Sequence, residues 1–207
     1  MRERLARRTQ DISPFYVMEL LNRAKQLEQQ GVDVIHMEIG EPDFTTPQRV
    51  IAAGINYIES GDVKYTPAAG AGELREKIAE FYQQRYAVKV DKRRIFVTPG
   101  ASGAFLLAFG VSVNPGEVVL MSDPCYPCNS NFIKLFDGHA RTIPVDAADN
   151  YQLSADLITQ HWTPVTKGAL IASPSNPTGT LITAQALKKA VSTVNQLGGC
   201  FYSDEIY

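Results

Sequence analysis

The fold is decided by GALIASPSNPTGT, residues 168–180, together with GGCFYSDEIY, residues 198–207. Each begins with a short apolar run that is typical of a strand buried on both faces. Between the two, apolar side chains recur at helical spacing and predict a helix over residues 183–197. A strand, a helix and a strand in this order predict two parallel strands joined by a crossover helix.

The same pattern continues on the N-terminal side of this unit. Further strand-like runs lie at residues 94–98, 118–122 and 141–145, and residues 102–113 carry a helical pattern. The tight turn Asn114-Pro115-Gly116 separates that helix from the strand that follows it. The sequence therefore predicts an α/β fold, with a mostly parallel sheet and crossover helices.

The first part of the chain lacks this alternation. A helix is expected to start at the capping pair Ser13-Pro14, a second at Thr46, and a third is expected to end near Tyr86. We therefore expect an N-terminal arm over residues 1–45, separate from a larger domain over residues 46–207.

Charge and hydropathy limit the classes of function. The 207-residue chain is 44% hydrophobic and has a net charge of −2 without a basic block, which gives no reason to expect nucleic acid or an anionic membrane as a partner. No apolar run is long enough to span a bilayer. The basic residues 2–8 are not followed by the apolar region of a signal peptide. We expect a cytoplasmic protein.

The cysteines and histidines give no strong signal. The three cysteines imply no closed disulfide framework. Cys125 and Cys128 have the spacing of a redox pair or of half a zinc site, but no second cysteine or histidine pair lies at ligand spacing. The three histidines are scattered and are interpreted as surface or satisfied core residues. No metal site is predicted.

Ligands of a parallel sheet bind at the carboxyl ends of its strands, and two candidate features fall there after earlier strands. Small residues at 98–103 precede a helix, whose free N–H groups would suit a phosphate, although such residues between a strand and a helix more often form a simple tight turn. Tyr126 follows the next strand, where it would stack on a planar ligand or pack within its loop.

Two more candidates follow the later strands. Asn176 lies in a rigid turn, and a cis bond before Pro177 would fix the direction of its amide. Asp204 follows an apolar strand, as a magnesium-binding Walker carboxylate would, but no phosphate-binding lysine loop precedes it. It would instead meet a cationic nitrogen, with the hydroxyl of Tyr207 reaching a nearby oxygen.

In this order the motifs resemble the class I aminotransferases, the aspartate aminotransferase superfamily of pyridoxal phosphate (PLP) enzymes of fold type I. The resemblance runs through essentially the whole chain. Its most specific part is the pair SPSNPTG at 173–179 and SDEIY at 203–207. Further matches are GEPDF at 40–44, YTP at 65–67 with Gly70, and TPGAS at 98–102.

The resemblance implies how the cofactor would be held. The backbone of Gly100, Ala101 and Ser102 would hold the PLP phosphate, and Tyr126 would stack on the pyridine ring. Asn176 and Tyr207 would donate hydrogen bonds to the phenolic oxygen of the ring. Asp204 would pair with the protonated ring nitrogen, which makes the ring an electron sink.

The resemblance also implies partners and substrates. Gly40 matches the glycine whose N–H faces the substrate carboxylate, and Tyr65 matches the tyrosine that reaches the phosphate in the partner subunit. The intact protein would then be a homodimer that moves an amino group between an amino acid and a 2-oxo acid.

Other parts of the family's machinery have no match in this chain. The Schiff-base lysine and two arginines of the family lie beyond its Asp-Glu-x-Tyr segment, so no catalytic residue is assigned. We expect an incomplete large domain with the N-terminal segment of a small domain, a fragment that is inactive and poorly stable alone. The alternatives are a non-catalytic remnant, half of a split enzyme, or a PLP-dependent lyase or synthase of the same fold. The amino-acid substrate is not specified by these motifs.

Overall fold

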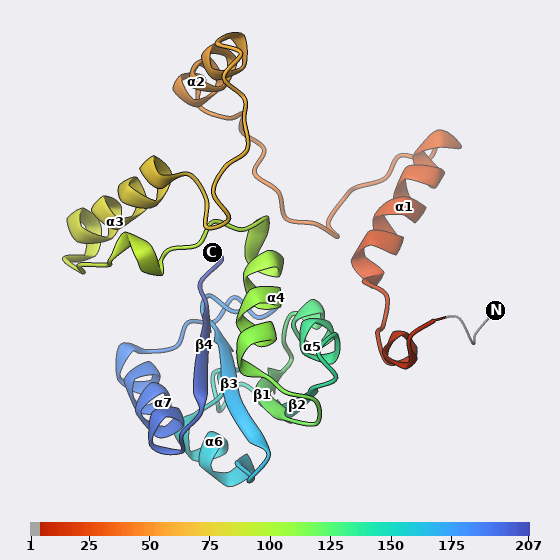
Figure 1. The fold of residues 1–207 in the computed structure, drawn as a ribbon. Helices are drawn as coiled ribbons and strands as arrows, with labels where there is room; N and C mark the ends of the chain where they lie inside the picture. The colour runs from red at the N-terminus through yellow and green to blue at the C-terminus, as the bar shows by residue number, and fades with distance from the viewer. Residues whose placement is uncertain (1–4) are drawn as a thin grey trace. The chain divides into compact units, whose positions relative to one another are not determined.

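The computed structural model describes residues 5–207 and divides the chain into two compact units (Figure 1). One unit comprises Thr98–Tyr207 with the N-terminal segment up to Ser13, and the other is Pro14–Val97. The boundary expected near residue 45 remains a prediction. Each unit is described by itself.

The first unit is built on a four-stranded sheet. Its strands are β1 (Val118–Asp123), β2 (His139–Pro144), β3 (Thr166–Ala172) and β4 (Cys200–Asp204). They lie in the order β2-β1-β3-β4, and every neighbouring pair is parallel. This confirms the predicted α/β fold with a parallel sheet.

Helices cover both faces of this sheet (Figure 1). They are α4 (Gly100–Ser112), α5 (Pro127–Lys134), α6 (Ala155–His161) and α7 (Ala184–Gln196). One hydrophobic cluster joins α6 and α7 to one face, and a second joins α4 and α5 to the other. Parallel strands need such crossover connections, and the central strands β1 and β3 are buried on both sides as a result.

The alternation of side chains along the central strands explains the two clusters. On β1, Leu120 packs towards α6 and α7, while its neighbours Val119 and Met121 pack towards α4 and α5. On β3, Ala169 and Ile171 face the first cluster and Leu170 the second. Successive strand residues point to opposite faces, so a continuous apolar run serves both. Burial of each large side chain contributes about 1.5–3 kcal/mol.

Local signals set the ends of the helices in this unit. The hydroxyls of Ser154 and Thr183 cap α6 and α7 by accepting backbone N–H groups three residues later. The predicted turn before β1 is present: Glu117 N–H donates to the Asn114 carbonyl at 3.0 Å, and Gly116 has a φ of 82°. Such a positive φ suits glycine at this place in a turn.

A close approach of β3 to β4 depends on Gly168. This residue pairs in register with Cys200 on β4. A Cβ atom at Gly168 would overlap the Cys200 carbonyl oxygen and lie 2.8 Å from Cε2 of Tyr202. The sheet therefore needs glycine at this position.

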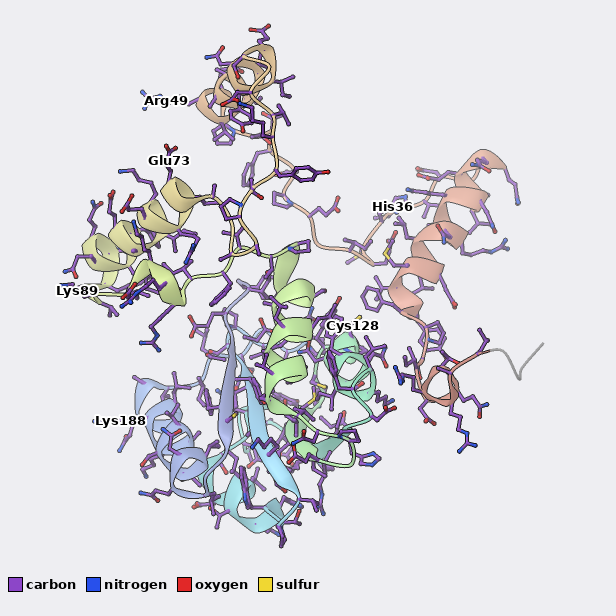
Figure 2. All side chains as sticks on the ribbon, viewed as in Figure 1. His36, Arg49, Glu73, Lys89, Cys128 and Lys188 are labelled. Atoms are coloured by element: carbon purple, nitrogen blue, oxygen red, sulfur yellow. The ribbon has the colours of Figure 1, made fainter. Side chains whose placement is uncertain are left out.

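The second unit contains three α-helices among its described elements: α1 (Tyr16–Gln29), α2 (Gln48–Glu59) and α3 (Gly72–Tyr86). No residue of Pro14–Val97 is buried within it. It also contains ion pairs. In one of them His36, labelled in Figure 2, lies between two carboxylates, with Nδ1 2.6 Å from Oε1 of Glu38 and Nε2 3.0 Å from Oε1 of Glu28. These carboxylates raise the pKa of His36.

The strand expected at residues 94–98 does not form. Residues 92–94 form a 3₁₀ turn, and residues 95–98 pair with no strand in the described part of the chain. The Val97 N–H instead donates to the Ala69 carbonyl. An apolar run becomes a strand only when a neighbouring backbone completes its hydrogen bonds, and none does here.

The first helix also starts later than expected. It begins at Tyr16, with Phe15 in extended conformation at the N-cap position, and not at Ser13-Pro14. The Ser13 carbonyl instead accepts a hydrogen bond from the Asn131 amide at 3.2 Å. Within residues 5–207, no helix combines the length and the apolar character that crossing a membrane requires.

Candidate functional site

A cavity of about 200 Å³ opens at the carboxyl ends of the strands in the first unit. Four segments far apart in the sequence line it: the start of α4, the start of α5, the turn after β3, and the end of β4 with the residues that follow. Six of the predicted site residues lie on its wall, namely Ala101, Ser102, Tyr126, Asn176, Asp204 and Tyr207. Carboxyl ends of parallel strands share one edge of a sheet, which explains this convergence.

The start of α4 is suited to an anion. Pro99 occupies its N-cap position, and no side chain caps the helix there. Gly100, which begins α4, has a φ of 71°. A Cβ at Gly103 would lie 2.8 Å from Cδ of Pro99, so the small side chains let the first turn pack closely on its own loop. The N–H groups of a first turn and the helix dipole together favour a phosphate.

Tyr126 is held at the start of α5. It occupies the N-cap position, and Pro127 fixes the first residue of the helix. Burial, and then a hydrogen bond with the Cys128 thiol, raise the pKa of Tyr126 to about 12. Figure 2 labels Cys128 on α5. The phenol therefore remains neutral at physiological pH and presents an uncharged ring to the cavity.

The turn after β3 presents an amide to Tyr207. The amide Nδ2 of Asn176 donates to the Tyr207 hydroxyl at 3.1 Å. The turn is closed by hydrogen bonds from Ser175 N–H to the Thr180 carbonyl and from Gly179 N–H to the Ser175 carbonyl. The Asn176–Pro177 bond is cis, as expected. The Tyr207 hydroxyl still has its own hydrogen to donate to a ligand oxygen.

Asp204 is the charged residue of the cavity wall. It ends β4 opposite Ala172 of β3, and it is 9% exposed. Its carbonyl accepts a hydrogen bond from the Ser173 N–H at 3.0 Å, which ties the end of β4 to the turn that carries Asn176. Its carboxylate, the only charged group among the described lining residues, would attract a cation into the cavity.

Asn129 also lines this cavity, and no sequence motif points to it. It lies on α5, is 1% exposed, and its Nδ2 atom has no hydrogen-bond partner among residues 5–207. The one sequence signal is its position four residues before the buried Ile133, which places both on the inner face of the helix.

Gly40 and Tyr65 belong to the second unit. Both are exposed there, and the roles expected of them stay predictions. Cys125 and Cys128 are free thiols. In the part of the chain that the structure describes, no group of three or more histidine, cysteine or carboxylate side chains could hold a metal.

Besides Tyr126, two half-buried groups, Tyr202 on β4 and Cys125 just before α5, make stability depend on alkaline pH. Burial raises the pKa of Tyr202 to about 12, and burial followed by the charge of Asp123 raises that of Cys125 to about 11. Raised values mean that folding favours the protonated forms, so their stabilising contribution is complete below the ordinary values and is lost as pH rises through the raised ones.

We therefore expect the free energy of unfolding to fall between about pH 9 and about pH 12. Urea denaturation at several pH values measures this. Tyr202→Phe keeps the ring that packs on Phe109 but removes the hydroxyl that contacts Ser112, so its loss of stability above pH 10 should be smaller. Equal pH profiles for the variant and the wild type would contradict the assignment to Tyr202.

Comparison with known proteins identifies the family. A family model described as aminotransferase class I and II matches residues 32–207. The chain is 35% identical over 203 residues to the (5-formylfuran-3-yl)methyl phosphate transaminase of Methanocaldococcus jannaschii, covering 98% of this chain and 52% of that protein. It is 32% identical over 207 residues to an aspartate aminotransferase of a Bacillus species, covering 100% of this chain and 53% of the relative.

Solved structures agree with these sequence relatives. An aminotransferase from Mycobacterium tuberculosis superposes with a TM-score of 0.93 at 32% identity, over 98% of this chain and 52% of that one. The Thermus thermophilus aspartate aminotransferase with maleate also gives 0.93, at 29% identity, over 98% and 53%. The chain spans about half the length of the curated relatives it matches. Sequence and fold together show that this protein belongs to the class I and II aminotransferase family.

Proposed function

We propose that this protein takes part in PLP-dependent transfer of an amino group between an amino acid and a 2-oxo acid. The observation that carries the proposal is the convergence of an uncapped helix start, a neutral aromatic ring, an Asn176–Tyr207 pair and a buried carboxylate on one cavity. These groups match, in kind, the parts of a phosphorylated pyridine that bears a ring oxygen.

The residues present fit that cofactor. The start of α4 would take its phosphate, Tyr126 would stack on its ring, and Asn176 and Tyr207 would donate to its phenolic oxygen. Asp204 would pair with its ring nitrogen. The buried amide of Asn129, which has no partner among residues 5–207, is a further polar group that a filled cavity would satisfy.

The chain's residues would support the chemistry by keeping a proton on the ring nitrogen of the cofactor and by fixing the orientation of its ring. When bound, PLP supplies an electron sink for the negative charge that develops at the α-carbon of an amino acid. The Asp204 carboxylate would keep a proton on the ring nitrogen, because a nearby anion favours the cationic form. Asn176 and Tyr207 would fix the ring in its plane, and the neutral Tyr126 would cover one face.

The relatives support the same reaction class, since the four described above are named transaminases or aminotransferases. We further propose the arrangement that the family implies for the intact protein: a homodimer in the cytoplasm, with Tyr65 reaching the cofactor phosphate of the partner and Gly40 facing the substrate carboxylate. The N-terminal arm over residues 1–45 and the larger domain over residues 46–207 belong to that proposal.

An isotope-transfer experiment tests the reaction class. The protein, expressed from its intact gene, is incubated with PLP, an amino acid labelled with ¹⁵N, and an unlabelled 2-oxo acid. We expect the label to appear in the new amino acid, as mass spectrometry would show. Release of the label as ammonia would indicate a lyase instead. No conversion with any of a panel of amino acids would contradict the proposal.

A further inference from the structure

Asn129 is a buried donor without an acceptor. Only 1% of the residue is exposed, it lines the cavity from α5, and its Nδ2 has no hydrogen-bond partner among residues 5–207. Leaving such a donor unsatisfied in a folded protein costs about 1–3 kcal/mol. Buried amides are therefore nearly always paired, and an orphan on a cavity wall indicates a partner that the working site provides.

The same wall holds an acceptor of complementary kind. Asp204 is 9% exposed, and its hydrogen bonds within the described chain are made by its backbone, so its carboxylate oxygens are available as acceptors. A buried carboxylate needs donors as much as a buried amide needs acceptors. The cavity of about 200 Å³ has room for a ligand and for a water molecule between polar groups.

We propose that Asn129 is a positioning residue for Asp204, and that its Nδ2 donates to the Asp204 carboxylate, directly or through one ordered water, in the loaded site. The inference rests on the proposed function, because it concerns the carboxylate assigned there to the ring nitrogen. A donor to an ionised carboxylate favours the ionised form and fixes its direction. Asn129 thereby favours the charged form of Asp204 and aims it at the cation.

Few other groups around Asp204 change charge in the acid range. Tyr126 and Tyr207 line the same cavity, and Cys128 on α5 contacts Tyr126. Phenols and thiols ionise above neutral pH. The α4 segment contributes no ionisable side chain, and Asp123, at the end of β1, acts on Cys125. A change of binding at acid pH would therefore report mainly on Asp204 and on the ligand itself.

Pyridoxamine phosphate is a suitable probe, because it lacks the aldehyde that reacts with surface lysines. Its affinity for the full chain is measured by equilibrium dialysis from about pH 5 to about pH 9. The second ionisation of its phosphate, near pH 6, also lies in this range, but it is common to all variants. Differences between variants therefore come from the protein.

Two substitutions remove the donor in different ways. Asn129→Leu keeps the approximate volume without polar atoms, and Asn129→Asp keeps the shape but replaces the donor with a second carboxylate. We expect Asn129→Leu to bind about tenfold more weakly at neutral pH, and to lose binding about one pH unit higher than the wild type. Asn129→Asp should move the acid loss further in the same direction, because like charges disfavour ionisation.

Asn131→Leu is the matched control. It lies on the same helix, but it is not on the cavity wall, and its amide donates to the Ser13 carbonyl. Its binding curve should follow that of the wild type at every pH. Thermal melting of each variant without ligand checks that the fold is retained, and Asn129→Leu should melt no lower than the wild type, since it removes an unsatisfied donor.

Three outcomes would overturn the inference. If both Asn129 variants bind with wild-type affinity and pH dependence, the positioning role is wrong while cofactor binding stands. A loss that is equal at every pH and accompanied by a lower melting temperature would indicate a purely structural residue. If the wild type itself does not bind pyridoxamine phosphate, the proposed cofactor site fails together with the inference.

Discussion

Replacement of Asp204 with asparagine is expected to weaken the binding of pyridoxamine phosphate by about a hundredfold at neutral pH. Asparagine keeps the size and shape of the side chain but removes the only charge among the described lining residues of the cavity. A hydrogen bond between a carboxylate and a ring cation is stronger than a neutral one, and burial at 9% exposure protects it from screening by salt. Equilibrium dialysis measures the change.

The adjacent carboxylate provides the control for this prediction. Glu205→Gln removes the same charge one residue later, but Glu205 is exposed, lies outside the cavity wall and contacts the Ser203 hydroxyl at 2.9 Å. Its affinity should change less than about twofold, as expected of an exposed charge. Equal losses in the two variants would show that Asp204 acts only through the net charge of the molecule, and the proposed ring contact would be wrong.

Gly168→Ala is expected to lower the free energy of unfolding by more than about 3 kcal/mol. The added methyl group would overlap the Cys200 carbonyl oxygen, and this oxygen belongs to the backbone of a paired strand. It cannot move aside unless β4 shifts away from β3. Since β4 carries Asp204, the variant should also lose ligand affinity. Chemical denaturation followed by circular dichroism measures the stability.

A glycine-to-alanine substitution at an uncrowded position is the control, because it shows the effect of alanine on stability without steric overlap. Gly54 lies inside α2, and a Cβ atom there would meet no atom within 4 Å. Gly54→Ala should leave stability unchanged or raise it by up to about 1 kcal/mol, because alanine favours helix more than glycine. A Gly168→Ala variant as stable as the wild type would show that β3 and β4 can separate without loss, contrary to the register described here.

The central strands β1 and β3 could be predicted from sequence because they are buried on both faces. A central strand such as β3 must be apolar at successive positions, so its composition alone indicates it. Two short helices, α5 and α6, could not be predicted from apolar composition in this way. The α5 segment contains two asparagines and a serine, which favour helices weakly, and α6 has only seven residues. The cap at Ser154 was the available sign of α6.

The expected strand at residues 94–98 shows what composition cannot supply. An apolar run indicates that a segment tends to be buried, but a strand also needs a partner backbone in register. The structure gives residues 95–98 none in the described chain. Pairing is a property of two segments, and the sequence of one of them does not determine it.

The cavity wall was predictable wherever a residue follows a strand. Asn176 comes after β3 and Asp204 is the last residue of β4, and the geometry of a parallel sheet brings such positions together. Asn129 follows no strand and belongs to no motif. Its importance comes from the unpaired state of one nitrogen atom, which depends on packing around α5 and is visible only in three dimensions.

The residues that line the cavity are far apart in the sequence, so they are added to the growing chain at different times during synthesis. Ala101 and Asp204 line the same cavity, yet they are 103 residues apart. At the usual rate of translation, Asp204 is added roughly 5–20 seconds after Ala101. The nascent chain therefore displays the α4 and α5 wall, with the amide of Asn129, well before the opposing carboxylate exists. A ligand present in the cell can stabilise this domain only after β4 has been made.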